Sequence, residues 1–572
     1  MRAVCKYTPV ELFAGFGEEC AFMQDAPVSL ERAEAAGHAN LCGFGKAVIE
    51  EALSGNVDRL VLVNCCDVMR RCHDVIAVEQ TCETLLLMDL PHSCGPCQIE
   101  ALARSLRRLR DQYAHATGAA FNLKACQAAF APVPHATGPY VALLGARTGS
   151  QVEAAARRAF GCQVRNLTCT GNRALDMPEE ALTADDEDEF FAAYAQALLA
   201  QVPCMRMNDS TGRRALLDDP NLVGIVYHTM KFCDFYSVEY AEIAARASVP
   251  LCKVESDFTA QSAEQLRTRI EAFAESLAAR QERKTDGEEP PDARLKPEGK
   301  PAMKTTGSAG AARYVAGIDS GSTSTDVVVL DGDGNVVAAV IVPTGAGASK
   351  SSEACLAQAL SEAGISRDDV SCVVATGYGR AYIGEGDESV TEITCHAEGA
   401  RRLDSRVRTV IDIGGQDSKV ISLDELGRVE NFVMNDKCAA GTGRFLEMMA
   451  RALQVPIDEL ATMGLAWRED ITISSTCSVF AESEVVSLVA QDKDPADIAH
   501  GLYESVAAKT TGLVKRAKGS GPYMMTGGVA ANAGVVAAIE RRLGEKLIVS
   551  DQAQLCGALG AAIIALRRVA PR

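Results

Sequence analysis

The sequence predicts an α/β protein with at least two domains. Its 572 residues are too many for a single hydrophobic core. In residues 1–280, short β-rich runs alternate with helical patterns, as in parallel sheets, and a break near residue 135 separates two such subdomains. Residues 281–312 are rich in charge, Pro, Gly and Ser, as a disordered linker is. We therefore expect one domain at 1–280, a linker at 281–312 and a second domain at 313–572.

The composition argues against several classes of protein. A formal charge of −19 disfavours nucleic acid or an anionic membrane as the main partner. The N-terminal sequence MRAVCKYTPVELFAGFGEEC lacks the basic-then-apolar order of a signal peptide. The longest apolar run, LCGALGAAIIAL, is too short to span a bilayer. We therefore expect a cytoplasmic protein.

Several predicted strands of the first domain lead into cysteines. The strand patterns lie in RLVLVNCCD, TLLLMDLPHSCGPC, YVALLGARTG, CQVRNLTCTG, LVGIVYHTMKFCD and VPLCKVESDFT. Ligands of open α/β sheets bind at the carboxyl ends of the strands. The candidate site residues at these ends are Cys65, Cys66, Cys94, Cys97, Cys169 and Cys233. Two further candidates are Cys42, which precedes a predicted helix, and Cys204, in a predicted loop.

The number of cysteines indicates metal or redox chemistry. The chain has 21 cysteines, and cytosolic thiols are normally kept reduced rather than paired. An iron–sulfur centre fits, because it needs several thiolates and helix N-termini offset its negative charge. A zinc site is an alternative, although the paired CxxC spacing is absent. A thioredoxin-like redox pair at Cys94–Cys97 is another, although Ser93 stands where such motifs usually have tryptophan.

The first domain resembles the 2-hydroxyacyl-CoA dehydratase superfamily, and most closely its double-cubane cluster branch. The matching motifs are NCCDVMRR, LMDLP, NLTCTGNR, PCMRM, GIVYHTMKFCDFYSVEY and ESDFTAQSAEQLRTRIEAF. This resemblance implies two flavodoxin-like subdomains that clasp an iron–sulfur centre, either a double cubane with six cysteines or a single cubane with three. It implies the ligands Cys66, Cys233, Cys42, Cys97, Cys169 and Cys204, with Cys94 and Cys65 as reserves.

In the second domain, Cys438 and Cys477 each lie one to three residues before a helical pattern. A helix N-terminus carries partial positive charge, which lowers the pKa of a thiol and favours the metal-binding thiolate. Two ligands are too few for a four-thiolate site, so a second copy of the chain would complete it. The alternative is a pair of ordinary buried cysteines. The predicted apolar helix faces consist of Phe445, Leu446, Met449 and Leu453 in the first helix and Val485, Val486 and Val489 in the second.

Two strand–turn–strand segments of the second domain share one design, which suggests a duplicated domain. In GIDSGSTSTD a strand ends at Asp319 before a turn at Ser320 to Ser324, and in IDIGGQDSK a strand reaches Asp412 before Gly414–Gly415. Such loops bind phosphates through backbone N–H groups, while the carboxylate binds Mg²⁺ or water. A third glycine-rich loop lies in MMTGGVAANAGVV.

These loops, in this order, resemble the actin/Hsp70/sugar-kinase ATPase fold. The finer resemblance is to the ATPase activators of 2-hydroxyacyl-CoA dehydratases, shared with benzoyl-CoA reductase ATPase subunits. It rests on GIDSGSTSTD, ATGYGR, TEITCHAEGA, IDIGGQDSK, MNDKCAAGTGRFLEMMA, ISSTCSVFAESE and TGGVAAN. It implies a homodimer that shares one 4Fe–4S cluster through Cys438 and Cys477 of each subunit. Two departures are Asp326, where activators commonly have lysine, and Cys395, where alanine is usual.

The resemblance also implies the nucleotide-binding residues. The first phosphate loop contains Asp319, Gly321, Ser322 and Thr323, and the second contains Asp412, Gly414, Gly415 and Gln416. Gln416 or Asp417 would place the attacking water. Gly441 and Gly443 would lie between cluster and nucleotide, and Gly527, Gly528 and Asn532 would meet adenosine. Glu392 and His396 are further candidates.

The implied function is ATP-dependent low-potential electron transfer. The second domain would reduce the iron–sulfur centre of the first, which would reduce a small-molecule acceptor, with a ferredoxin or flavodoxin as donor. The main alternative is a 2-hydroxyacyl-CoA dehydratase or benzoyl-CoA reductase-type system that acts on an acyl-CoA. A carbohydrate kinase and a chaperone-like ATPase remain open from the loops alone.

Overall fold

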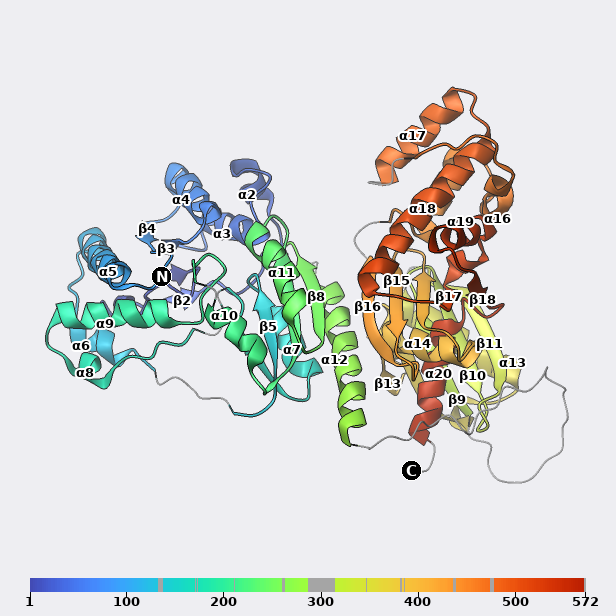
Figure 1. Ribbon diagram of the computed structural model, residues 1–572, viewed down its shortest axis with the longest axis horizontal. Helices are drawn as coiled ribbons and strands as arrows, with labels where there is room; N and C mark the ends of the chain where they lie inside the picture. The colour runs from blue at the N-terminus through green and yellow to red at the C-terminus, as the bar shows by residue number, and fades with distance from the viewer. Residues whose placement is uncertain are drawn as a thin grey trace. The chain divides into compact units, whose positions relative to one another are not determined.

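The chain forms two compact units, Met1–Leu277 and Ala278–Arg572, in a computed structural model (Figure 1). The structure describes residues 1–131, 137–169, 171, 173–209, 211–259, 263–285, 314–345, 347–380, 383–384, 386–435, 439–473 and 478–569. Of the predicted linker, residues 281–285 continue helix α12 (Ala263–Thr285), and the remainder lies outside the described residues. Within the described residues, no helix is both long enough and apolar enough to cross a membrane.

The first unit contains two four-stranded sheets in which every strand pair is parallel. In order across the first sheet, the strands are β2 (Ala21–Phe22), β1 (Arg2–Ala3), β3 (Arg59–Asn64) and β4 (Thr84–Asp89). Across the second they are β6 (Gln163–Asn166), β5 (Tyr140–Gly145), β7 (Leu222–Met230) and β8 (Leu251–Ser256). Both sheets have the strand order 2-1-3-4, typical of flavodoxin-like folds. The predicted pair of parallel-sheet subdomains is confirmed.

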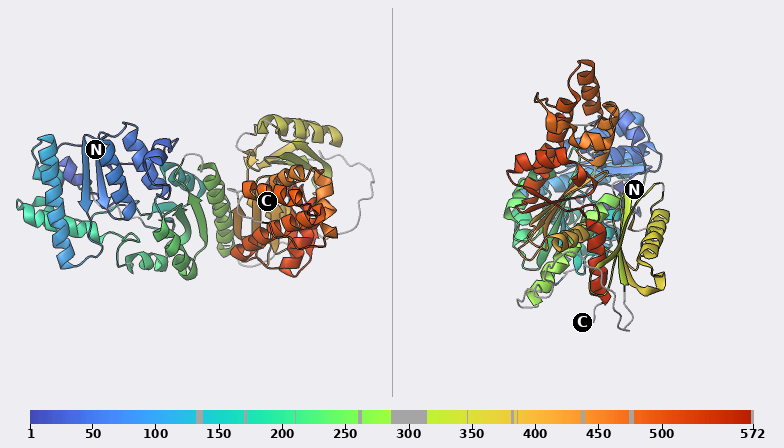
Figure 2. Two further views of the ribbon diagram at one scale, coloured as in Figure 1. Left: turned by 90° about the horizontal axis from the view of Figure 1, so that it is seen from above. Right: turned by 90° about the vertical axis from the view of Figure 1, so that its right-hand side faces the viewer.

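Helices flank the first sheet on both faces (Figure 2). Residues 60–63 of β3 are fully buried, as expected of a strand covered on both sides. The helices of this unit are α1 (Val10–Ala14), α2 (Glu31–Ala36), α3 (Gly43–Leu53), α4 (Asp67–Glu79), α5 (Pro96–Thr117), α6 (Leu123–Ala128), α7 (Ser150–Ala159), α8 (Glu179–Thr183), α9 (Glu187–Ala200), α10 (Thr211–Ala215), α11 (Asp234–Arg246) and the start of α12.

The second unit contains two five-stranded sheets of identical topology, which confirms the predicted duplication. Each has three antiparallel strands followed by two parallel ones. In order, the first sheet has β11 (Val336–Pro343), β10 (Ser324–Leu330), β9 (Tyr314–Ser320), β12 (Val370–Thr376) and β13 (Glu388–Ser389). The second has β16 (Val429–Asn435), β15 (Ser418–Leu423), β14 (Thr409–Ile413), β17 (Tyr523–Thr526) and β18 (Leu547–Val549).

The helices of the second unit are α13 (Ala348–Ala363), α14 (Glu392–Leu403), α15 (Gly443–Ala452), α16 (Ile457–Met463), α17 (Ser478–Ala490), α18 (Pro495–Ala517), α19 (Ala533–Leu543) and α20 (Cys556–Val569). Helix α13 covers one face of the first sheet and α20 the other (Figure 2). Alternate residues of β10 serve the two faces: Val327 packs with α13, and Val328 packs with α20. Asp326 is two residues before Val328 in the strand, so it lies on the same face of the sheet, the one that α20 covers.

Two details of the predicted cysteine helices are wrong. The helix after Cys438 begins only at Gly443, because Gly441 adopts φ +94° and delays the first turn. The predicted apolar face of α17 is not a buried face within one chain: Val485 is buried, whereas Val486 and Val489 are exposed. Cys438 and Cys477 themselves lie outside the described residues.

Candidate functional site

Buried and half-buried cysteines gather at the carboxyl ends of the parallel strands in the first unit. Three of the predicted ligands are the N-cap residues of helices: Cys42 for α3, Cys66 for α4 and Cys233 for α11. None of these three forms a side-chain capping bond. Their thiols therefore remain available at helix N-termini, where the backbone favours negative charge.

These thiols lie close enough to affect one another's ionisation. Burial raises the pKa of both Cys42 and Cys233 to about 11. The pKa of Cys66 is raised first by the Cys65 thiol and then by burial, and that of Cys65 is raised first by the thiol of Cys5. Burial thus outweighs the helix N-terminus here, so the thiols are protonated until a cation displaces their protons.

Three cationic side chains lie among the same cysteines. Arg147 is 4% exposed, lies 4.5 Å from the ring centre of Phe44, and its Nε has no hydrogen-bond partner. The buried Nε of Arg206 also lacks a partner, and its guanidinium lies 5.0 Å from the ring centre of Phe235. Lys6 is 3% exposed, and its Nζ donates to a backbone carbonyl.

These cations interact with the cysteines. Burial lowers the pKa of Arg147 to about 10, and Cys169, Cys5 and the Asp25 carboxylate oppose that change. Burial likewise lowers the pKa of Lys6, which Cys204 opposes most strongly. Buried cations of this kind are costly unless an anionic group compensates them. The unpartnered Nε atoms and the surrounding thiols fit an anionic iron–sulfur centre.

Among the residues that the structure describes, no three His, Cys, Asp or Glu side chains lie close enough together to bind one metal ion.

The predicted ligands outside the helix caps have different environments. Cys204 is 2% exposed, and its N–H donates to the Tyr7 hydroxyl at 3.2 Å, which fixes the loop that also carries Arg206. Cys169 follows β6 and is half-buried. In contrast, Cys97 in the first turn of α5 and its neighbour Cys94 are both exposed.

Sequence reasoning missed Cys5 as a member of this group. It follows β1 at the carboxyl end of the first sheet and is 5% exposed. Its place after the first strand, at the same edge as Cys65, becomes evident only in the structure. The strand is only two residues long, Arg2–Ala3, which is why its apolar pattern is weak.

The second unit has a cavity of about 350 Å³ between its two sheets. The predicted residues that line it are Asp319, Gly321, Ser322, Thr323, Glu392, His396, Asp412, Gly414, Gly415, Asp417, Gly443, Gly527, Gly528 and Asn532. Gln416 is exposed and Gly441 is buried, and neither is part of this lining. The three predicted phosphate and adenosine loops thus meet at one cavity.

Two glycines lie close to the carboxylates of Asp319 and Asp412. A Cβ on Gly557 would lie 2.0 Å from Asp319 Oδ2. A Cβ on Gly527, whose φ is +81°, would lie 2.8 Å from Asp412 Oδ1. Both distances are shorter than side chains tolerate. At Gly527 the Ile413 carbonyl oxygen is closer still, at 2.5 Å, so backbone and carboxylate both exclude a side chain there.

One lysine stabilises the acidic side of the cavity. Lys419 Nζ lies 2.9 Å from Asp417, 3.2 Å from Asp412 and 3.3 Å from Glu392. Burial alone would raise the pKa of Asp412, but His396 and Lys419 outweigh it and lower that pKa to about 2. Burial raises the pKa of Glu392 to about 8 despite Lys419. Asp412 is therefore ionised at neutral pH and suited to binding a metal or a water.

Sequence reasoning missed Lys419 and did not assign Asp326 to the cavity, although both line it. Lys419 could have been found from the hairpin register, because it lies directly opposite Asp412. Cys395, the other departure from the activator pattern, is fully buried in the cluster that joins α14 to α20. It therefore acts in packing.

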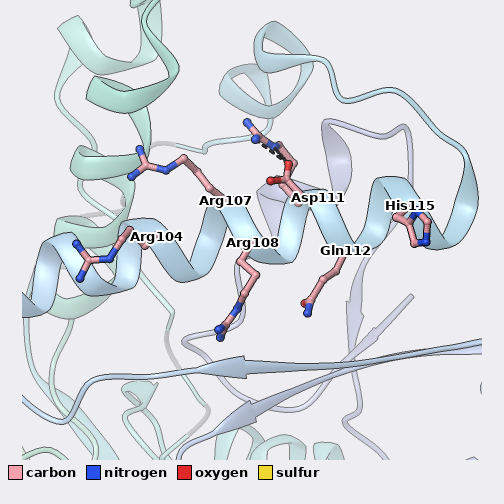
Figure 3. Close-up of a pocket in the computed structure, with 7 residues that line it drawn as sticks. Arg104, Arg107, Arg108, Asp111, Gln112 and His115 are labelled. Atoms are coloured by element: carbon pink, nitrogen blue, oxygen red, sulfur yellow. Dashed lines mark hydrogen bonds and ion pairs between the residues drawn. The ribbon is translucent and has the colours of Figure 1, made fainter.

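A further hollow of about 620 Å³ lies along α5 and is lined by arginines (Figure 3). Figure 3 shows Arg107 and Arg108 leaving the helix on different sides. Each forms an ion pair, Arg107 with Asp188 and Arg108 with Asp89. Their charge is already compensated, in contrast to that of Arg147 and Arg206.

Comparison with known proteins separates the two halves in the same way. A family model described as "BadF/BadG/BcrA/BcrD ATPase family" matches residues 316–565. A model described as "2-hydroxyglutaryl-CoA dehydratase, D-component" matches residues 5–133 and 148–277. Both matches confirm the resemblances inferred from the motifs.

Named relatives match the second half over nearly their full length. The 2-hydroxyisocaproyl-CoA dehydratase activator of Clostridioides difficile is 44% identical over 252 residues, or 44% of this chain and 94% of the relative. The activator of lactoyl-CoA dehydratase of Anaerotignum propionicum is 46% identical over 252 residues, or 44% of this chain and 97% of the relative.

A solved structure matches the same region. The crystal structure of component A of the (R)-2-hydroxyglutaryl-CoA dehydratase of Acidaminococcus fermentans is 43% identical and has a TM-score of 0.44. The match covers 45% of this chain and 99% of that chain. The duplicated sheets have the predicted actin/Hsp70/sugar-kinase-like fold. The chain therefore belongs to the BadF/BadG/BcrA/BcrD ATPase family through its second half, which follows a region that matches the D-component model.

Proposed function

We propose that this protein is an ATP-driven iron–sulfur reductase. The second unit uses ATP to deliver low-potential electrons, and an iron–sulfur centre in the first unit receives them and reduces a small-molecule acceptor. The observation that carries the proposal is the presence, in one chain, of a cation-bordered cysteine group and an ATPase cavity. A ferredoxin or flavodoxin is the proposed donor.

The cavity residues have distinct roles in ATP hydrolysis. The glycine-rich loops bind the phosphates through their N–H groups, and Asp319 and Asp412 bind Mg²⁺ or water. His396 and Lys419 together lower the pKa of Asp412 and keep it ionised. Asp417 places the attacking water; Gln416 is the alternative, since its exposed side chain could turn inward when ATP closes the two sheets.

Hydrogen bonds link the second phosphate loop to the helix that follows Cys438. The Gly443 N–H donates to the Gly414 carbonyl at 2.9 Å, and the Arg444 N–H donates to the Gly415 carbonyl at 2.9 Å. A movement of this loop on ATP binding therefore moves α15 directly. Making a one-electron donor stronger by roughly 300 mV costs about 7 kcal/mol, which one or two ATP can supply.

The exposed face of α17 supports a homodimer that shares a 4Fe–4S cluster through Cys438 and Cys477 of each subunit. Val479, Phe480 and Val486 are 65%, 69% and 53% exposed within one chain. Val479 and Phe480 lie within three residues of Cys477, and Val486 lies on the same helix, so a partner that completes the cluster would also cover them. The cluster supplies the low-potential electron.

The first unit would hold its centre through Cys42, Cys66, Cys169, Cys204 and Cys233, with Cys97 as the predicted sixth ligand. The buried group offers Cys5 and Cys65 as alternatives to the exposed Cys97. Iron and acid-labile sulfide of about eight per first unit would support a double cubane, and about four a single cubane.

The test uses protein purified without oxygen and titrated with a low-potential reductant. With ATP, the visible absorbance near 400 nm that belongs to the first-unit centre should bleach, and without ATP it should not. A Cys477→Ser protein should still hydrolyse ATP and lose this bleaching. If Cys477→Ser or Cys438→Ala still transferred electrons in an ATP-dependent manner, the proposal would be wrong.

A second candidate is a dehydratase that acts on an acyl-CoA. It is favoured by the D-component match, which spans both subdomains of the first unit. Incubation with 2-hydroxyacyl-CoA, ATP and reductant, followed by mass spectrometry, distinguishes the two. Formation of the enoyl-CoA would establish the dehydratase, and its absence with sustained electron transfer would leave the reductase.

A further inference from the structure

Two carboxylates face each other across neighbouring strands in the ATPase cavity. Asp326 of β10 lies directly opposite Asp319 of β9, and both line the cavity. Asp326 is 5% exposed, and its Oδ1 has no hydrogen-bond partner. His396 Nε2 lies 3.8 Å from Asp319 Oδ2.

The second repeat places a different charge at the corresponding position. There, Lys419 of β15 lies opposite Asp412 of β14, and the two side chains form an ion pair of 3.2 Å. The two sheets have the same strand order, so Asp326 in the first repeat corresponds to Lys419 in the second. Like charges directly opposite each other in a sheet are destabilising, and buried carboxylates without a cation are costly.

We propose that Asp319 and Asp326 together bind a divalent cation, Mg²⁺ in the cell, before the nucleotide arrives. In the first repeat, this cation compensates the charge of the carboxylates, as the Lys419 ammonium does in the second repeat. Mg²⁺ binds one or two carboxylates, keeps several waters and takes further ligands from phosphate oxygens. The inference deepens the proposed ATPase function, because the cation would then contact the phosphates of ATP.

Besides Asp319, the groups that face Asp326 are the Asp412 carboxylate and the Ser324 hydroxyl. In the second repeat, the Lys419 ammonium faces Asp412.

Titration with Mn²⁺, a paramagnetic substitute for Mg²⁺, tests the proposal on nucleotide-free, full-length protein with its iron–sulfur centres oxidised. Free Mn²⁺ is measured by electron paramagnetic resonance. We expect one tight site per chain that weakens at least tenfold in Asp326→Asn. The matched control is Asp333→Asn, in the exposed turn of the same hairpin, which should bind as the wild type does. Equal binding by Asp326→Asn, or no tight site in the wild type, would overturn the proposal.

A second variant separates a lost site from a misfolded one. Asp326→Lys copies the charge pattern of the second repeat, so it should lose nucleotide-free Mn²⁺ binding while melting at or above the wild-type temperature. If Asp326→Lys retained tight Mn²⁺ binding and Asp417→Asn lost it, the cation would lie at Asp417 in the second repeat, which would contradict the proposal. The readout needs no ATP, so a failure of the ATPase proposal would appear separately, as absent hydrolysis with Mn²⁺ binding intact.

Discussion

The two candidate sites have opposite electrostatic designs. In the first unit, Arg147 and Arg206 are cations with unpartnered Nε atoms among protonated thiols. In the second unit, the cavity has more carboxylates than cations, and Asp326 has an unpartnered oxygen. Each site therefore carries buried charge opposite in sign to a group that we propose it binds: an anionic cluster in one, and a divalent metal ion in the other.

The difference explains why the sites tolerate such costly groups. An uncompensated buried charge destabilises a fold, and binding a group of opposite sign recovers that loss. Ligand binding therefore stabilises the fold at both sites, through an anionic group in the first unit and a cation in the second. The following changes test this comparison, from the largest expected effect to the smallest.

Removing a thiol should have the largest effect in the first unit. We expect Cys66→Ala to lower the iron content from about ten to about two atoms per chain, because only the cluster shared in the second unit would remain. Colorimetric iron and sulfide analysis measures the loss, and ATP hydrolysis should continue. The control is Cys252→Ala, a buried cysteine of β8 outside the site. Full iron content in Cys66→Ala would remove this residue from the ligand set.

In the second unit, removing Lys419 should have the largest effect on stability. Lys419→Met leaves Asp412, Asp417 and Glu392 without their cation, which should cost about 3–5 kcal/mol of unfolding free energy. Urea denaturation measures the loss. Lys546→Met, at a side chain that is 90% exposed, is the control and should change stability by less than about 0.5 kcal/mol. A small effect at Lys419 would mean that the carboxylates are already protonated.

Removing the Arg206 guanidinium should shift the reduction potential of the first-unit centre without preventing the centre from binding. We expect Arg206→Gln to lower the reduction potential of the first-unit centre by about 100 mV, because one charge at about 6 Å and an effective dielectric constant of about 20 contributes roughly 2–3 kcal/mol. Potentiometric titration measures the shift at unchanged iron content. Arg104→Gln, at an exposed and ion-paired side chain of α5, should leave the potential unchanged. An unaltered potential in Arg206→Gln would place this guanidinium away from the centre.

The smallest change in stability is expected at Glu18, a carboxylate near the surface that is already paired with cations. Glu18 accepts from the N-terminal amine at 2.7 Å and from Arg59 at 2.8 Å, and its pKa is lowered, first by the amine. Its stabilisation is therefore present above the unfolded value of about 4.5 and is lost as pH falls through the lowered folded pKa. Glu18→Gln should cost about 0.5–1 kcal/mol at pH 7.

Denaturation at pH 7 and at pH 3 checks this expectation, and the difference between Glu18→Gln and the wild type should shrink at the lower pH. A loss that is equal at both values would show that the carboxylate acts through packing instead of charge. Raising the salt concentration at pH 7 should also reduce the difference, since exposed ion pairs are screened.

Local sequence patterns were sufficient for the fold and for much of the second site. Strand runs that alternate with helices predicted the parallel sheets, and two similar hairpins predicted the duplication. The loops at Asp319, Asp412 and Gly527 were predictable because phosphate-binding turns are encoded within a few consecutive residues. Gln416 shows the limit of that reasoning, since a loop motif does not specify which of its side chains faces the cavity.

Only the tertiary structure decided which charges meet. Lys6, Arg147 and Arg206 come from three distant segments with no shared motif, and packing alone brings them to the same cysteines. The same holds for the choice between Cys5 and Cys97, because the structure buries Cys5 and leaves Cys97 exposed. Sequence determines the local backbone through short-range sterics and hydrogen bonds, whereas desolvation and long-range charge depend on neighbours that the chain order does not reveal.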